Sequence, residues 1–337
     1  MSDNLEIVRS IFGVHKIKYK ILDDLGISKV NAFHINLTTI LNYALKHYPE
    51  LASEKEYLYI IVSQIINLVA HYRHYFVKRK CDPDIYIYGY NDKFKDTMKL
   101  LKVIVQYIPR VYYIKTKDFP VSSAILYVAD KYKSNLVLTK SKIDVLLVNP
   151  KINILKSNKD KSILYKHDNV FSKFVKKDYS DSVSWKLLPI FYTFSGLSGD
   201  RIKGFSPAKT LRLLNKAVES HRIVNEYYYD IDHVIDDIGD LIDLNDSDIS
   251  ILKDNFKNAN IVAKYRKYMT PIVREIIDNS IIDKFAKNDI RELNMKYFTG
   301  LDSLMIEELF EQVGQDKRTI RWWLNDTAKS KSWETCI

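Results

Sequence analysis

Residues 30–148 alternate between β-prone runs and helical segments, and this alternation constrains the fold more than any other feature. The β-prone runs lie at 30–36, 84–89, 110–114 and 135–138, with further β structure predicted over 144–148. Between them, the apolar periodicity predicts helices over 37–47, 57–79, 95–107 and 121–132. Alternation at these spacings predicts a twisted, mostly parallel sheet with helices on both faces, which is an α/β architecture.

The rest of the chain reads as helical. Residues 1–29 are expected to form an N-terminal helical extension, with its helix over 5–25, ahead of an α/β domain at 30–184. Residues 185–222 form a helical region in which Pro189 and Pro207 stand near helix starts. Residues 223–337 are interpreted as an acidic, mainly helical C-terminal region.

Charge is distributed unevenly along the chain. The net charge is +10, but residues 1–222 carry 37 Lys and Arg against 20 Asp and Glu, whereas residues 223–337 carry 15 against 22. An AT-rich genome would also raise the Lys content, together with Asn, Ile and Tyr, but would not reverse the charge along the chain. A basic domain attracts polyanions, and nucleic acid is the commonest of these.

Cysteine content and apolar runs bear on location. Cys81 and Cys336 are the only two cysteines, and neither has His or Cys neighbours at zinc-ligand spacing. The start of the chain lacks a signal-peptide pattern, and no apolar run reaches membrane-spanning length. These features predict a reducing, cytoplasmic setting with neither a disulfide framework nor a zinc site.

A glycine-rich run in the middle of the chain is the most specific motif. Its sequence, SGLSGDRIKGF over 195–205, is followed by PAKTLRLL over 207–214. This segment resembles the helix-three-turn-helix of the 5′ nuclease superfamily, which is flap endonuclease-like and PIN-like. The family pattern has two aspartates before the glycine turn. Leu197 stands in place of the first aspartate, and Asp200 retains the second.

Four earlier motifs of the same family occur in the same order. Asn36 stands where the first strand of the family ends in Asp, and Gly89 stands where the Phe-Asp strand ends. The segment 120–129 matches an acidic helix start but carries Ser122 and Ser123. In the segment 139–147, two further aspartates are replaced; the replacements are Ser141 and Ile143. The resemblance covers about residues 30–220 and predicts that these positions converge at the carboxyl ends of the strands.

The resemblance implies a nuclease fold without its nuclease site. The family hydrolyses phosphodiesters with two divalent metals held by carboxylates. Neutral side chains at these positions do not hold Mg²⁺, and Lys140 and Lys142 would repel it. We therefore expect no metal and no catalytic residue. The twenty or so residues between Gly89 and Arg110 also leave no room for the helical arch of the family.

DNA binding is the property that the hairpin is expected to keep. In the family, amides at the glycine turn and at the second helix grip a backbone phosphate, often with a K⁺ ion. Duplex DNA is the expected partner, with a purely structural hairpin as the alternative. The predicted binding residues are Arg201, Lys203, Gly204, Ser206 and Lys209, with Lys140 and Lys142 extending the positive surface.

Three functions remain open on the sequence. The first is an inactive, nucleic-acid-binding nuclease-like protein that assists viral replication, transcription or packaging, in the infected cytoplasm or the virion; the viral origin is inferred from composition. The second is an assembly subunit that docks a protein through the C-terminal region and its Trp-containing tail, 318–337. The third is an active metal-dependent nuclease with an atypical site, formed from Asp144, Asp200 and Asp92.

Overall fold

A computed structural model describes Ile11 and residues 30–52, 56–105, 110–157, 162–175 and 182–282 of the chain. Apart from Ile11, the helix predicted over 5–25 lies outside the described residues, as does the Trp-containing tail. Within the described ranges, none of the helices combines the length and the apolar composition that a membrane span requires.

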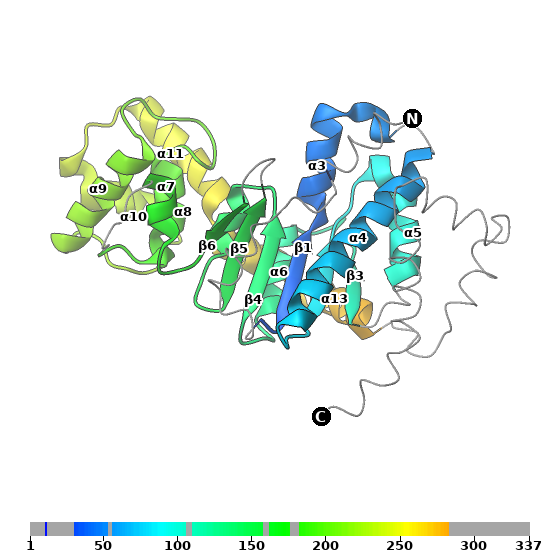
Figure 1. The fold of residues 1–337 in the computed structure, drawn as a ribbon. Coiled ribbons are helices and arrows are strands. Elements are labelled where there is room, and N and C mark those ends of the chain that lie inside the picture. The colour runs from blue at the N-terminus through cyan, green and yellow to red at the C-terminus, as the bar shows by residue number, and fades with distance from the viewer. Residues whose placement is uncertain are drawn as a thin grey trace, which may run out of the picture. The chain divides into compact units, whose positions relative to one another are not determined.

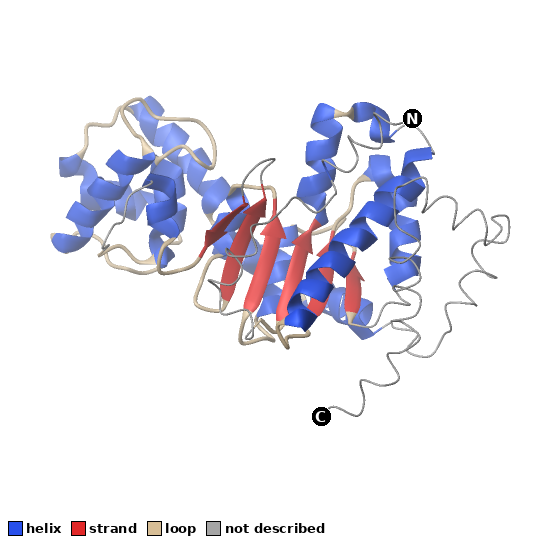
Figure 2. Ribbon diagram, in the orientation of Figure 1, coloured by secondary structure: helices blue, strands red, loops and turns tan. Residues whose placement is uncertain are grey.

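The predicted sheet is present. It has six strands in the order β3-β2-β1-β4-β5-β6 (Figure 2). The pairs β1 with β2, β2 with β3, and β4 with β5 are parallel, and β6 runs antiparallel to β5. The fold class is therefore the predicted α/β architecture, followed by a helical region. The strands are β1 (Ala32–Asn36), β2 (Asp84–Tyr88), β3 (Val111–Ile114), β4 (Asn135–Thr139), β5 (Ile152–Ser157) and β6 (Ser162–Tyr165).

The chain divides into two compact units, one of residues 1–121 with 274–337 and the other of residues 122–273. The first unit contains β1 to β3, and α4 lies along the face of β1 in Figure 1. Phe33 of β1 packs on Tyr72 and Phe76 of α4, with ring centroids 4.6 and 5.4 Å apart. Its helical elements are α3 (Leu37–His47), η2 (Pro49–Ala52), α4 (Glu56–Lys78), η3 (Asp92–Phe94) and α5 (Lys95–Val105).

Successive side chains of a strand point to opposite faces of the sheet, so a row of His and Tyr side chains lies on the face of β1, β2 and β3 that is opposite to Phe33. His34 stacks on Tyr86, and its Nδ1 lies 2.8 Å from the Tyr88 hydroxyl. Tyr86 stacks in turn on Tyr112 of β3. His34 is fully buried, so this row is part of the core.

The second unit contains β4 to β6 and a group of helices beside β6 (Figure 1). All seven residues of α8 are buried. Phe191 and Tyr192 of this helix contact Phe174 of α7, and α11 packs along α8. The helical elements are α6 (Val121–Ala129), η4 (Ile143–Leu147), α7 (Val170–Val175), η5 (Trp185–Leu187), α8 (Leu188–Phe194), α9 (Pro207–Glu219), α10 (Ile231–Ile238), η6 (Gly239–Leu241), α11 (Asp246–Ala259), α12 (Ile261–Tyr268) and α13 (Pro271–Ile282), the last of which continues into the first unit.

Two local predictions are wrong. Residues 144–148, predicted as β structure, lie mostly in the 3-10 helix η4, because the Asp144 carboxylate accepts a hydrogen bond from the Thr139 hydroxyl and closes the turn after β4. The helix predicted over 121–132 ends at Ala129. There the side-chain amide of Asn135, the first residue of β4, donates to the Ala129 carbonyl at 3.0 Å. This hydrogen bond satisfies an acceptor at the end of the helix.

The aromatic contact between β1 and α4 yields a stability prediction. Phe33→Ala would leave a cavity against Tyr72 and Phe76, and we expect it to lower the free energy of unfolding by about 3–5 kcal/mol. Urea denaturation followed by circular dichroism measures this change. Val224→Ala is the control, because Val224 is 56% exposed and its truncation should cost under about 0.5 kcal/mol. Equal losses in the two variants would contradict the packing described.

Candidate nucleic-acid interface

Asn36 and Gly89 lie side by side at the carboxyl ends of β1 and β2. Asn36 pairs in register with Tyr88, the residue before Gly89. The Asn36 side chain is the N-cap of α3, because its Oδ1 accepts a hydrogen bond from the Thr39 amide at 3.3 Å. Only 2% of Asn36 is exposed. The amide at the position where the family resemblance expects an aspartate therefore has a structural role.

Gly89 lies where a side chain would be tightly packed. A Cβ at this position would lie 3.1 Å from Cβ of Leu37 and 3.3 Å from the Thr38 nitrogen. The Tyr113 hydroxyl donates to the Gly89 carbonyl at 2.6 Å and holds the backbone in place. The end of β2, where the family resemblance expects an aspartate, is packed directly against the start of α3.

The other predicted positions lie in the second unit. Ser122 and Ser123 are in the first turn of α6. Ser123 is 1% exposed, and its hydroxyl has no hydrogen-bond partner among the described residues. Whether these serines and the strand ends of the first unit form one site stays a prediction.

The turn after β4 is closed by its own side chains. The Ser141 amide donates to Thr139 Oγ1 at 2.9 Å, and the Ile143 amide donates to Ser141 Oγ at 3.2 Å. Asp144, 4% exposed, accepts from the Thr139 hydroxyl. The Lys142 carbonyl accepts from the Tyr192 hydroxyl at 2.7 Å, which joins the turn to α8. Asp144 therefore serves the turn rather than an open ligand position.

Mg²⁺ does not fit the donors at these positions. It requires several oxygen ligands, with carboxylates among them. Asn36 caps a helix, Gly89 has no side chain, and Asp144 is engaged within its turn. Asp92 accepts from the Tyr90 hydroxyl at 2.7 Å. In the part of the chain that the structure describes, no three His, Cys, Asp or Glu side chains are grouped as metal ligands.

The predicted hairpin is formed by α8, the loop 195–206 and α9. Gly196 has φ of +65°, and a Cβ there would lie 2.9 Å from Cα of Arg201. Leu197 lies in this loop, and its amide donates to the Tyr192 carbonyl. Asp200 is exposed. The glycine therefore allows the tight return of the loop after α8.

Asn255 of α11 holds the loop from behind. This buried side chain donates to the Thr193 carbonyl at 3.1 Å and to the Asp200 carbonyl at 2.8 Å. Sequence reasoning missed Asn255, because a single Asn in an amphipathic helix carries no local signal of so distant a contact. It fixes the position of the loop that leads to α9.

The amino end of α9 is exposed and lacks acidic side chains in its first turn. Gly204, with φ of +91°, turns the chain, and Ser206 caps the helix by accepting from the Lys209 amide at 3.3 Å. Pro207 occupies the first turn. Orphan amides and the helix dipole favour an anion at such an end. The exposed residues around it are Arg201, Lys203, Gly204, Ser206 and Lys209.

The acidic run 230–248 is solvated. Asp232 and Asp240 are exposed and form ion pairs with Lys253 and Arg222, at 2.9 and 3.1 Å. Such surface pairs contribute little to stability. The run therefore reads as a solvent-facing surface of α10 and η6.

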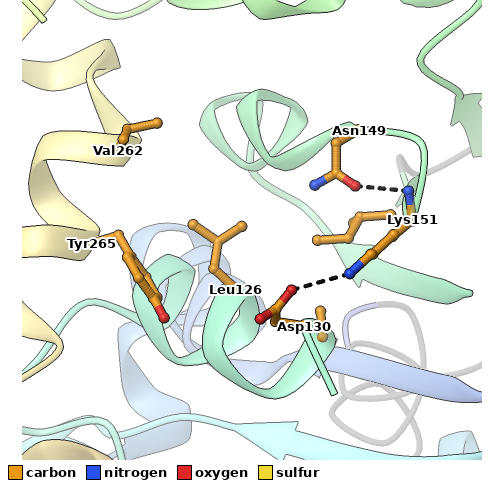
Figure 3. A pocket seen from close by; sticks show the side chains of 8 residues that line it. Leu126, Asp130, Asn149, Lys151, Val262 and Tyr265 are labelled. Atoms are coloured by element: carbon orange, nitrogen blue, oxygen red, sulfur yellow. Dashed lines mark hydrogen bonds and ion pairs between the residues drawn. The ribbon is translucent and has the colours of Figure 1, made fainter. Parts of the chain in front are cut away.

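A pocket of about 240 Å³ lies between the end of α6, the start of β5 and α12 (Figure 3). Leu126, Ile152 and Val262 line it with the ring of Tyr265. Lys151 and Asp130 form an ion pair of 3.2 Å at this pocket. None of the predicted nucleic-acid-binding residues lines it.

No protein-family model matches this chain, and no curated protein matches it significantly. Solved structures of similar fold include a variant of the bacteriophage T5 5′-exonuclease, with 10% identity, a TM-score of 0.45, and coverage of 75% of this chain and 99% of that one. The T5 flap endonuclease with DNA and metal ions is 9% identical, with a TM-score of 0.44, and the match covers 75% of this chain and 98% of that one. The catalytic core of Rad2 with DNA substrate is 12% identical, with a TM-score of 0.40, and the match covers 72% of this chain and 79% of that one.

The Asn255 contact generates a second prediction. Asn255→Ala would remove the hydrogen bonds to the Thr193 carbonyl at the end of α8 and to the Asp200 carbonyl in the loop, and we expect the free energy of unfolding to fall by about 1–3 kcal/mol. Thermal denaturation measures the change. Asn258→Ala on the same helix is the matched control, because Asn258 is exposed. A variant as stable as the control would show that Asn255 does not hold the hairpin loop.

Proposed function

We propose that this protein is a catalytically inactive, 5′ nuclease-like protein that binds the backbone of nucleic acid. The observation that carries the binding proposal is the amino end of α9. It is exposed, it follows a glycine turn, and it is surrounded by Arg201, Lys203 and Lys209 without a first-turn carboxylate. A phosphate is the anion that such a surface meets on nucleic acid.

Basic side chains elsewhere in the same unit support the proposal. Lys142 is exposed in the turn after β4, and Lys173 is exposed on α7. These lysines add positive charge that attracts phosphates, and such contacts do not distinguish one base from another. The binding that we propose is therefore electrostatic, indifferent to sequence and sensitive to salt.

The proposal of inactivity rests on the two strand ends of the first unit. Phosphodiester hydrolysis by divalent metals needs several carboxylates in one place. Asn36 is used as a helix cap, and Gly89, which has no side chain, is tightly packed against Leu37 and Thr38. Both arrangements support loss of the metal site.

A second function, assembly with a protein partner, is favoured by one observation. The four exposed large apolar residues of the described chain all lie after residue 223; they are Val224, Tyr229, Ile272 and Ile276. Such residues are common in protein interfaces when they cluster. A viral role, and a place in the infected cytoplasm or the virion, remain part of the proposal on composition alone.

The third prediction concerns catalysis. Purified protein incubated with flap, nicked and single-stranded DNA in Mg²⁺ or Mn²⁺ should leave every substrate intact, because the carboxylate set is missing. Gel electrophoresis of end-labelled strands measures cleavage. Asp200→Ala is the control for contamination. Cleavage by the parent protein that disappears in this variant would overturn the proposal of inactivity and favour an atypical metal site.

The fourth prediction concerns DNA binding. Affinity for duplex DNA should fall steeply with salt, and Lys203→Ala with Lys209→Ala should reduce the slope of log affinity against log salt by about two. Fluorescence anisotropy measures both quantities. Lys253→Ala with Lys257→Ala is the matched control, since these two α11 lysines are exposed but ion-paired with Asp232 and Asp254.

Two outcomes would contradict the hairpin proposal. One is a parent protein that does not bind duplex DNA at low salt. The other is a Lys203/Lys209 double variant that binds as well as the parent at every salt concentration. In either case the hairpin is a scaffold, and assembly with a protein partner becomes the leading function.

A further inference from the structure

The pocket between α6, β5 and α12 is lined by an aromatic ring and by aliphatic side chains. Figure 3 shows Val262 and Tyr265 on α12 and Leu126 on the neighbouring α6. Ile152, the first residue of β5, also lines the pocket and is buried. All four residues belong to the second unit. Such a lining favours a flat group that is largely apolar.

The volume of the pocket limits the size of its ligand. It is about 240 Å³, whereas pockets for drug-sized molecules range from about 300 to 1,000 Å³. One ring system therefore fits, and a larger ligand would place only one ring system inside. The polar atoms at the pocket then decide which ring system binds.

Asp130 and Lys151 place a hydrogen-bond acceptor beside a donor at this pocket. The Lys151 ammonium donates to Oδ1 of Asp130 at 3.2 Å. The second carboxylate oxygen of Asp130 makes no hydrogen bond with the described residues, and an ammonium carries three donors, so both groups can also bind a ligand. Both side chains are exposed, so the ion pair contributes little to stability.

Hydrogen bonds of the backbone fix where these two side chains begin. The Lys151 amide donates to Oδ1 of Asn149 at 2.8 Å, and the Lys151 carbonyl accepts from the backbone amide of Asn135 at 2.8 Å. Asp130 directly follows α6, and its amide donates to the Leu126 carbonyl at 3.0 Å. The order of acceptor and donor along the pocket is therefore set by the fold.

We propose that this pocket binds a nucleobase that carries an amino group beside a ring nitrogen, which means adenine or cytosine. The amino group donates to the Asp130 carboxylate, and the adjacent ring nitrogen accepts from the Lys151 ammonium. The face of the base packs against the Tyr265 ring, as bases do on aromatic side chains. Uracil and hypoxanthine carry a carbonyl in place of the amino group, and would bring an oxygen to the carboxylate.

This site goes beyond the proposed function, because phosphate contacts at the hairpin do not distinguish one base from another. None of the hairpin residues predicted to bind nucleic acid lines the pocket. The base belongs either to a nucleic-acid strand or to a free nucleoside or nucleotide. The first source rests on the proposed nucleic-acid binding, and the second is independent of it.

Isothermal titration calorimetry of the full chain with four nucleosides tests the recognition directly. Inosine differs from adenosine, and uridine from cytidine, by a carbonyl and an N–H in place of the amino group and the ring acceptor. We expect adenosine and cytidine to bind at least about tenfold more tightly than inosine and uridine, because the wrong edge leaves polar groups unpaired. Asp130→Ala should abolish this preference, because it removes the acceptor.

Each pocket variant has a matched control in the same unit. Asp168→Ala is the control for Asp130→Ala, because Asp168 is an exposed carboxylate that does not line the pocket. Tyr265→Leu should weaken adenosine binding about tenfold through loss of stacking. Tyr268→Leu on the same helix is its control, since Tyr268 does not line the pocket. Both controls should bind the nucleosides as the parent does.

The source of the base is tested by competition with single strands of DNA. An oligodeoxyadenylate that displaces adenosine, where an oligothymidylate of the same length does not, supports a base within a strand. Adenosine binding that neither strand displaces supports a free nucleoside or nucleotide.

The proposal is overturned if the parent binds neither adenosine nor cytidine, if it binds inosine and uridine as tightly, or if Asp130→Ala keeps the preference that Asp168→Ala shows. Asp130 is exposed, so its variant keeps the test valid even if Tyr265→Leu does not fold. Failure of the Lys203/Lys209 experiment would leave the nucleoside result unchanged, so the two proposals fail separately.

Discussion

Parallel pairing of strands is the constraint on which the rest of the structure depends. Because β1 and β2 run in the same direction, Asn36 and the residue after Tyr88 emerge at one edge. The same pairing of β4 with β5 brings the turn after Thr139 beside the end of β5. Helices must then connect the strands, and their packing determines how much space each strand end retains. The chemistry at these edges follows from which side chains are left there.

The strand and helix pattern could be predicted because it depends on local periodicity. Four of the predicted β-prone runs match strands to within a few residues, and the apolar runs between them are helices. The prediction failed at Asp144, where a run rich in Val and Leu is a 3-10 helix. A short apolar run reads the same as strand or helix, and a side-chain hydrogen bond from Thr139 decided between them.

The site was predictable only where a residue type carried the signal by itself. The glycine turn could be placed from the motif, and Gly204 has a φ of +91° in the structure. The role of Asn255 and the place of Tyr265 at the pocket could not be predicted, because each depends on contacts between segments far apart in the sequence. Tyr265 looks like one of many tyrosines until its helix is placed beside α6 and β5.

The packing at Gly89 has a consequence for how this protein can change. Any residue with a side chain at this position would press on Leu37 and on the backbone of Thr38. A side chain at position 89 would be accommodated only if Leu37 or the start of α3 moved by a few tenths of an ångström. The residue at position 89 and the position of α3 are therefore linked, and a change at one alters what the other tolerates.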